Sequence, residues 1–312
     1  MMFPPRAAVS HLVVSAVIVG TVVTGLVSAA QKTLGSPLQV SALGPSEALY
    51  PGAVGLVVVK ASRPLAALEG EAFDRAVYFW PADAPGEWHG LVGVGLETRP
   101  GTHVLRVKGS SPDGGTAAAE ASLSVGSRSY ETRRLRVAAN LVDPPEEEAA
   151  RIARDTKAMA DAFAVVGPDR LWRGAFEPPV PGAATSSFGR LSIMNGQPRG
   201  RHQGTDFRAA EGTPVVAPNA GRIALAQDLY FAGNTVIVDH GLGVFSLVAH
   251  LSRIAVGIGD MVARGERLGL SGATGRVTGP HLHWAVRFGP LSVDPLALMS
   301  AAANEDTAQP VR

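Results

Sequence analysis

Short runs of β-forming residues recur along the first part of the chain, from about Leu38 to Ala138. Pro-Gly and Asp-Gly pairs separate these runs and favour turns between them. About seven short strands at this spacing predict a β-sandwich of the immunoglobulin-like type. The strongest strand candidates are Ala53–Lys60, Ala76–Trp80, His89–Glu97, His103–Lys108 and Ala119–Val125.

The hydrophobic pattern changes at Pro144. Two prolines and the acidic run Glu146–Glu148 suit the start of a helix, because proline is tolerated in the first turn and acidic side chains stabilise the N-terminal end of the helix dipole. Apolar residues then recur near helical spacing until Gly167-Pro168. We expect a helix over Pro144–Val165 that links two domains, followed by an extended, stiff connector over Glu177–Gly182.

A second region of short strands runs from Ser186 to about Met299. Its candidates are Thr213–Ala217, Gly221–Ala226, Thr235–Asp239, Val244–Leu251 and His281–Phe288. The last residues, 300–312, are small and polar and are expected to be disordered. The pattern therefore predicts a mainly β chain in five parts. These are an export segment at 1–36, a sandwich accessory domain at 37–140, the linking helix and connector at 141–182, a second β domain at 183–299 and the tail at 300–312.

The first part has the pattern of an export segment. Arg6 precedes the charge-free stretch Ala7–Gln31, whose apolar centre is followed by small residues. This order is typical of a secretory signal, here with a cleavage site before Ala30. The stretch is also long enough to span a bilayer as an uncleaved inner-membrane anchor. Both interpretations place the rest of the chain in the periplasm or another extracytoplasmic space, and a buried core helix is the remaining alternative.

Composition narrows the chemistry. The formal net charge is +1, and the sequence does not resemble that of a nucleic-acid-binding protein. A nucleic-acid-binding face would require Lys and Arg clustered on one surface. The sequence contains no cysteine, which excludes disulfides and thiolate metal sites. A transition-metal site in this chain must therefore use histidine and carboxylate ligands.

Histidines are concentrated in the second β region, which holds five of the eight. In the run HQGTD, His202 and Asp206 lie four residues apart, so they share a face in an extended strand as well as in a helix. Gly204 favours the extended form and leaves space for an ion between the two side chains. Imidazole and carboxylate suit zinc, and a surface His-Asp hydrogen bond is the alternative for this motif in isolation.

The remaining histidines differ in their sequence context. His281 and His283 share one face of a strand, although an isolated H-x-H is equally compatible with a structural role. His250 ends an apolar strand, where a lone histidine is usually a hydrogen-bonded structural residue. His240 stands between a strand end and a turn and is interpreted as structural. His89 and His103 are assigned structural roles, and His11 belongs to the export segment.

These residues together predict a catalytic metal site. Three protein ligands and one open position are typical of catalytic zinc, and His202, Asp206 and one member of the 281/283 pair supply three ligands. The other member of the pair and His250 would then transfer protons and stabilise a tetrahedral intermediate. The H-E-x-x-H motif of many zinc proteases does not occur in the sequence, so the expected arrangement differs from theirs.

On these motifs the sequence resembles the lysostaphin-like, or LytM-type, zinc endopeptidases of bacterial cell walls. The resemblance runs from Ser186 to about Pro295, with the motifs in the family's order and spacing. They are HQGTDF at 202–207, GTPVVAP at 212–218, GNTVIVDHG at 233–241, AHLS at 249–252 and TGPHLHW at 278–284. The N-terminal β region and helix are also similar to an accessory domain of some Gram-negative periplasmic members. Val248 and Ala285 depart from an aromatic residue and a glutamate that many members carry.

The resemblance implies zinc bound by His202, Asp206 and His283, with His250 and His281 as the catalytic pair. It implies an antiparallel β barrel-sandwich peptidase domain with a groove over the metal. The implied activity is endopeptidase cleavage of the peptide stems or cross-links of bacterial peptidoglycan. A non-catalytic member that binds the cell wall or regulates another hydrolase is the alternative, and the complete set of five site residues favours the enzyme.

Overall fold

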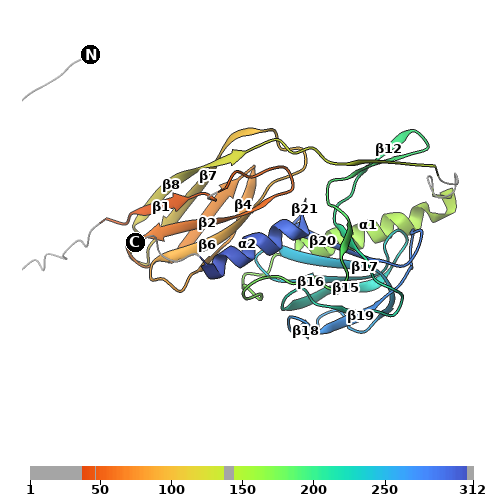
Figure 1. Ribbon diagram of the computed structural model, residues 1–312. Helices are drawn as coiled ribbons and strands as arrows, with labels where there is room; N and C mark the ends of the chain where they lie inside the picture. Colours follow the sequence, from red (N-terminus) through yellow and green to blue (C-terminus); the bar gives the residue numbers. More distant parts are fainter. Residues whose placement is uncertain (1–36, 46, 137–143, 308–312) are drawn as a thin grey trace, which may run out of the picture. The chain divides into compact units, whose positions relative to one another are not determined.

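The computed structural model describes residues 37–45, 47–136 and 144–307 (Figure 1). From Leu38 onward the chain forms one compact unit that is mainly β, as expected. The export segment expected at 1–36 lies outside the described residues, as do 137–143 and 308–312. Across the described ranges no helix is both long and apolar enough to cross a membrane.

The first half of the described chain contains two four-stranded antiparallel sheets. In spatial order, one consists of β1 (Val40–Leu43), β2 (Val54–Ala61), β6 (Glu87–Gly93) and β5 (Phe79–Pro81). The other consists of β4 (Arg75–Val77), β3 (Ala67–Ala72), β7 (Gly101–Ser110) and β8 (Thr116–Val125). Val57 and Val59 of the first sheet share a core with Leu105 and Leu123 of the second. Two sheets therefore bury their apolar faces in one core, and the immunoglobulin-like type of this sandwich stays a prediction.

The expected strand Ala76–Trp80 is divided between the two sheets. Val77 is buried in the core that the sheets share, whereas Trp80 packs in the core of the second half. Because the two residues serve different cores, the chain leaves one sheet after β4 and joins the other at β5. The sequence analysis did not find β3, whose segment ALEGEA carries two glutamates and a glycine and is mostly exposed.

A small sheet connects the two halves of the chain. It consists of β12 (Gln197–Arg201), β11 (Leu191–Met194) and β9 (Thr132–Leu135), and β9 pairs with β11 in parallel. Strand β12 is exposed along its whole length and contains proline and glycine. It therefore lacks the alternation by which strands are recognised in a sequence.

The second half is built on a ten-stranded sheet. Its main path follows the order β10 (Ala184–Ser186), β13 (Thr205–Phe207), β20 (Leu282–Phe288), β17 (Val244–Ile254), β16 (Gly233–Asp239), β15 (Gly221–Leu229) and β18 (Met261–Val262). Off this path lie β14 (Pro214–Val216), β19 (Arg267–Ser271) and β21 (Leu291–Val293). Between the described strands β10 and β18 no pairing closes the path, so the sheet is open rather than the barrel expected.

The expected linking helix is part of the core of the second half. A short 3-10 helix, Glu146–Glu148, leads into α1 (Ala149–Ala164). Phe163 of α1 packs with Ile237 and Phe245 on one face of the large sheet. After α1, Trp172, Phe176 and Val180 are buried in the other core cluster of the second half. The segment that was expected to link two domains is therefore itself part of the core of the second half.

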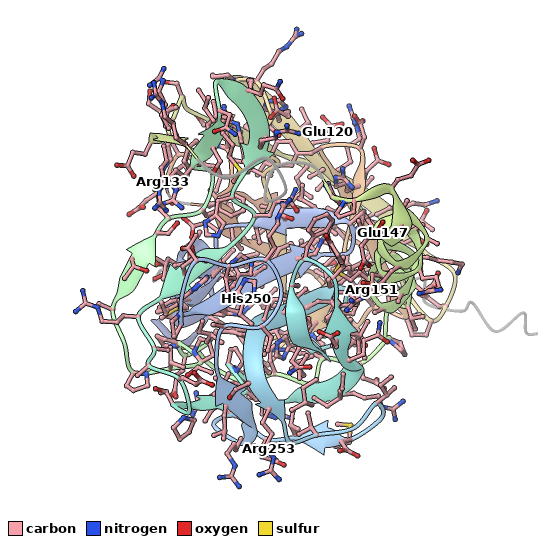
Figure 2. The ribbon with its side chains drawn as sticks, turned by 90° about the vertical axis from the view of Figure 1, so that its right-hand side faces the viewer. Glu120, Arg133, Glu147, Arg151, His250 and Arg253 are labelled. Carbon is pink, nitrogen blue, oxygen red and sulfur yellow. The ribbon has the colours of Figure 1, made fainter. Side chains whose placement is uncertain are left out.

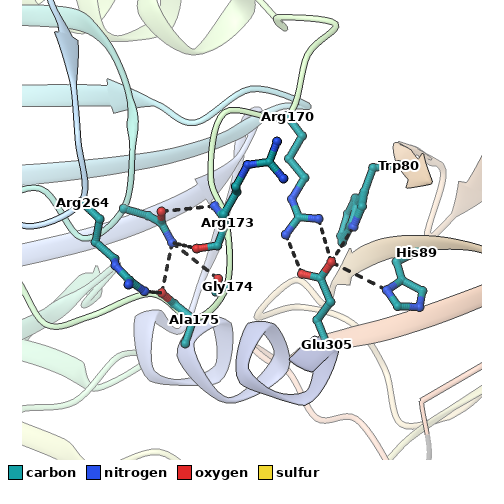
Figure 3. Close-up of polar contacts among 9 residues, drawn as sticks. Trp80, His89, Arg170, Arg173, Gly174, Ala175, Arg264 and Glu305 are labelled. Carbon is teal, nitrogen blue, oxygen red and sulfur yellow. Dashed lines mark hydrogen bonds and ion pairs between the residues drawn. The ribbon is translucent and has the colours of Figure 1, made fainter. Parts of the chain in front are cut away.

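The tail expected to be disordered is helical as far as the structure describes it. Helix α2 spans Pro295–Thr307 and buries Leu298, Ala301 and Ala302 in the core of the second half. Alanine has the highest helix propensity, so this small-residue segment forms a helix once it has a surface to pack on. Glu305 adds polar contacts with Trp80 and Arg170 (Figure 3). The prediction of disorder for 300–307 was therefore wrong.

Candidate active site

Asp206 and His283 face each other across two adjacent strands. Asp206 in β13 is the direct cross-strand partner of His283 in β20. The Asp206 Oδ1 atom lies 2.9 Å from His283 Nδ1. Antiparallel pairing thus brings together two residues that are 77 positions apart in the sequence.

His202 completes a cluster of three donor groups. Its Nε2 atom lies 3.0 Å from Asp206 Oδ1 and 3.1 Å from His283 Nδ1. The continuous strand expected from His202 to Asp206 does not form, because β12 ends at Arg201 and the chain bends at Gly204 before β13. A side chain at Gly204 would place its Cβ atom 2.7 Å from the His283 ring, so glycine is required for the close approach.

The donor set fits a divalent metal ion. The Nδ1–H of His202 donates to the carbonyl oxygen of Ser187 at 3.0 Å, which leaves the Nε2 lone pair pointing at the cluster. One ligand atom from each of His202, Asp206 and His283 lies within 4.8 Å of the others. Lone pairs that converge in this way repel one another unless a cation or a proton lies between them. Two imidazoles and one carboxylate are a typical ligand set for catalytic zinc.

His281 and His250 lie beside this cluster. The His281 Nε2 atom is 3.9 Å from Asp206 Oδ1, and the rings of His281 and His250 are 4.9 Å apart between centroids. The Nδ1–H of His281 donates to the carbonyl of Gly279 at 2.9 Å, and that of His250 donates to the carbonyl of Thr274 at 3.0 Å. In both rings Nε2 is therefore the atom that can accept a proton.

His250 occupies an unusual place in its strand. Its backbone φ is 66°, in the left-handed region that non-glycine residues seldom adopt. Ala249 pairs with His283 of β20, and Leu251 pairs with Ser271 of β19. His250 therefore lies at the point where β17 changes from pairing with β20 to pairing with β19. The register between β16 and β17 also shifts at this point, as at a β-bulge. Figure 2 shows His250 among the strands of the large sheet, with α1 and its Arg151 to one side.

The electrostatic surroundings lower the pKa values of Asp206, His283 and His250. Burial opposes ionisation of Asp206, but the close contacts of its carboxylate with the rings of His202 and His283 outweigh burial and hold the pKa of this carboxyl well below its usual range. Burial lowers the pKa of His283. Burial, with the nearby His283 and His281, lowers the pKa of His250 to about 4. A carboxylate and neutral imidazoles are the protonation states that metal ligands require.

The other described histidines lie apart from this cluster. His240 is fully buried, its Nδ1–H donates to the carbonyl of Ala220 at 2.7 Å, and its Nε2 lies 2.9 Å from Ser246 Oγ. Both ring nitrogens are thus bonded, in agreement with the structural role predicted for His240. His89 is buried beside Glu87, and His103 bonds the carbonyl of Arg99.

The structure brings together all five predicted site residues and adds three backbone groups. The carbonyls of Ser187, Thr274 and Gly279 each accept an Nδ1–H and so determine which ring nitrogen faces the site. Sequence analysis missed these groups because a carbonyl has no side-chain signature. Gly275, which follows Thr274, and Gly279 itself were the available signal, since glycines mark turns and loops.

Comparison with known proteins identifies the family. Residues 200–295 match peptidase family M23. The peptidoglycan DD-endopeptidase ShyA of Vibrio cholerae is 48% identical over 83 residues, which are 27% of this chain and 19% of the relative. The cell division protein DipM of Caulobacter vibrioides is 36% identical over 154 residues, which are 49% of this chain and 24% of the relative. The matched segments therefore span only a fifth to a quarter of these curated relatives.

A solved structure extends the similarity beyond the site. It is the crystal structure of a Pseudomonas aeruginosa protein assigned to peptidase M23, with 31% identity and a TM-score of 0.63. The match covers 82% of this chain and 96% of that chain, so it includes the first half of the described residues as well as the large sheet. With this agreement in sequence and fold, the chain belongs to peptidase family M23, the LytM or lysostaphin type of metallopeptidase.

Proposed function

We propose that this protein is a zinc-dependent endopeptidase that hydrolyses peptide cross-links of bacterial peptidoglycan. The observation that carries the proposal is the convergence of His202 Nε2, Asp206 Oδ1 and His283 Nδ1 beside two further imidazoles. Three protein ligands leave a coordination position for water and substrate, as in catalytic zinc sites. When bound, zinc would lower the pKa of water to about 7 and polarise the scissile carbonyl.

His281 and His250 are proposed as the proton-transfer groups. Peptide hydrolysis requires removal of a proton from the attacking water and delivery of a proton to the departing amine nitrogen. Both rings have Nδ1–H bonded to a carbonyl, so each has Nε2 available for these transfers. The lowered pKa of His250 keeps its Nε2 unprotonated at neutral pH.

Substrate class and location rest on the relatives and on the sequence. ShyA is named as a peptidoglycan DD-endopeptidase, and Mpg of Neisseria meningitidis, 41% identical over 97 residues, as a DD-carboxypeptidase/endopeptidase. Peptidoglycan lies outside the cytoplasm, and the export pattern of residues 1–36 agrees with that location. We accordingly propose that the chain acts in the periplasm, exported or anchored by this segment.

We propose the division into domains that the sequence pattern predicts. Residues 37–140 would form an immunoglobulin-like accessory sandwich, and the chain from about residue 183 would carry the peptidase chemistry. The shared core of the two N-terminal sheets supports the first assignment. The position of all five site residues on or next to the large sheet supports the second.

Digestion of defined muropeptides tests the function. Purified protein would be incubated with cross-linked muropeptide dimers, and the products would be separated and weighed by mass spectrometry. We expect monomers whose mass shows addition of one water to a peptide bond. Chelator-treated protein should release none, and His281→Ala should release them much more slowly than the original protein. Intact dimers after incubation with zinc-loaded protein would contradict the proposal.

The alternative function is a non-catalytic member that binds the cell wall or regulates another hydrolase. The presence of all ligand and proton-transfer groups at close distances speaks against it. One experiment distinguishes the two functions. A non-catalytic protein would sediment with purified peptidoglycan sacculi without changing the muropeptide profile, whereas an endopeptidase would release soluble fragments.

A further inference from the structure

Two loops meet beside the proposed proton-transfer residue His250. One leads into β16 at Gly233, and the other contains Thr274 and Gly275. A Cβ atom built on Gly275 would lie 2.4 Å from the backbone nitrogen of Gly233, and one built on Gly233 would lie 2.3 Å from Thr274 Oγ1. Both glycines have positive φ, 62° and 77°, so the two backbones are in direct contact without intervening side chains.

Thr274 forms three hydrogen bonds at this junction. Its hydroxyl donates to the carbonyl of Leu251 at 2.7 Å and accepts from the backbone N–H of Asn234 at 3.0 Å. Its own carbonyl accepts the Nδ1–H of His250 at 3.0 Å. Leu251 directly follows His250, so Thr274 holds both the backbone beyond His250 and the ring of His250.

His250 requires such support because regular sheet pairing does not fix it. The residue lies in the left-handed region at a shift of register, and its neighbours Ala249 and Leu251 pair with different strands. Its backbone N–H bonds the carbonyl of Ala232, which leaves the ring orientation undetermined. A half-turn of the ring would put Cδ2 in the place of Nδ1 and Cε1 in the place of Nε2. By accepting the Nδ1–H, the carbonyl of Thr274 therefore selects one ring orientation and the tautomer with an unprotonated Nε2.

We propose that Thr274 is the positioning residue for His250. Its hydroxyl bonds the backbone of Asn234 in β16 and of Leu251 in β17 and so fixes the position of the loop. The carbonyl of Thr274 then orients the His250 ring so that Nε2 faces the proposed metal ligands. The inference rests on the proposed role of His250 in proton transfer. Thr274 itself need not contact substrate or metal, so it acts through His250 alone.

The test compares Thr274→Val, which keeps the shape and removes the hydroxyl, with Thr274→Ser, which keeps the hydroxyl. Zinc content, kcat and KM on a muropeptide dimer would be measured for the full-length protein. We expect Thr274→Val to keep one zinc and an unchanged KM and to lose about 10- to 100-fold in kcat, since small misplacements of a reacting group reduce rates on this scale. The kcat of Thr274→Ser should lie within about threefold of that of the original protein, because the hydroxyl that positions the loop is retained.

A matched control removes a hydroxyl just before β14. Thr213 donates its hydroxyl to the carbonyl of Ala210 at 2.7 Å, outside the two loops, so Thr213→Val should leave kcat unchanged. Equal kcat in Thr274→Val and the original protein would overturn the proposal. Equal losses in Thr274→Ser and Thr274→Val would overturn the role of the hydroxyl.

A second measurement needs no valine variant and no activity. Nitrogen-15 NMR distinguishes a protonated Nδ1 from a protonated Nε2, and the His250 signals are identified by their loss in His250→Ala. We expect protonated Nδ1 and unprotonated Nε2 in the original protein and in Thr274→Ser. The opposite tautomer would overturn the proposal even if Thr274→Val fails to fold. If muropeptides stay intact, the proposed function fails, and this measurement still tests the contact between Thr274 and His250.

Discussion

Arg170 and Glu305 form a two-bond ion pair between the segment after α1 and the end of α2. The guanidinium Nη1 and Nη2 atoms donate to the two carboxylate oxygens at 2.7 and 2.6 Å. Trp80 Nε1 of β5 donates to the same carboxylate at 2.8 Å, and His89 of β6 lies 3.8 Å from it (Figure 3). One carboxylate thus joins three segments that are far apart in the sequence.

We expect Glu305→Gln to remove a pH-dependent part of the stability. Burial raises the pKa of Glu305, but bonds from His89, Arg170 and Trp80 outweigh it and lower the pKa to about 2, from an ordinary 4.5. A lowered pKa contributes stability that is complete above pH 4.5 and is lost as the pH falls toward 2. The free energy of unfolding in urea should therefore fall less steeply over this range in Glu305→Gln than in the original protein.

Glu120→Gln is the control for this pH series. Glu120 pairs with Arg106 on the surface, where both side chains are more than 60% exposed, and such pairs contribute little. Its acid slope should match that of the original protein. A Glu305→Gln slope identical to that of Glu120→Gln would show that the buried pair does not control acid stability.

Zinc content should distinguish variants of the proposed metal ligands from variants of the proposed proton-transfer histidines. His283→Ala leaves two protein ligands and should lose both zinc and activity. His281→Ala and His250→Ala should keep one zinc and lose about 10²- to 10⁴-fold in rate. Zinc content and cleavage rate would be measured together at a fixed zinc concentration. A zinc-free His281→Ala beside a zinc-loaded His283→Ala would reverse the proposed roles, and a fully active His250→Ala would exclude His250 from the reaction.

The backbone of His250 predicts an unusual order of stabilities. In the left-handed region glycine is favoured over alanine by about 1 kcal/mol, because it has no Cβ atom to clash with the carbonyl. We expect His250→Gly to be about 1 kcal/mol more stable than His250→Ala, with the activity of both strongly reduced. At His103, in the regular strand β7, the order should be reversed. Thermal unfolding of the four variants checks this, and a His250→Ala at least as stable as His250→Gly would refute it.

The stability of truncated chains should show which segments contribute to the hydrophobic core of the second half. Trp172 and Phe176 are buried in the same cluster as Trp284, and Trp80 packs edge-on against Trp172 at 5.3 Å between centroids. We expect stability to decrease from the chain 38–307 through 144–307 to 183–299, because each truncation removes buried aromatic side chains worth about 3–5 kcal/mol each. Circular dichroism during urea unfolding would measure this order, and a 183–299 chain as stable as 144–307 would contradict it.

Local patterns in the sequence were sufficient for several conclusions. The strands around 54–61, 233–239 and 244–254 follow from side-chain periodicity, which depends only on neighbouring residues. His283 lies in the expected strand, whereas His281 lies just before β20 and forms an isolated bridge with Gly272. The helix over 149–164 follows from its acidic start and apolar spacing. The absence of cysteine limited any metal site to histidine and carboxylate ligands before the fold was considered.

Long-range packing decided what these patterns could not. The pairing of Asp206 with His283 depends on which strands become neighbours, and the bend of His250 into the site depends on a register shift between three strands. Residues 300–307 are helical because a core is available for their alanines, a condition that the segment itself does not contain. The sequence by itself therefore determined the residue types of the site and the periodic elements. Only the tertiary structure decided their distances, orientations and tautomers, because these depend on contacts between residues far apart in the chain.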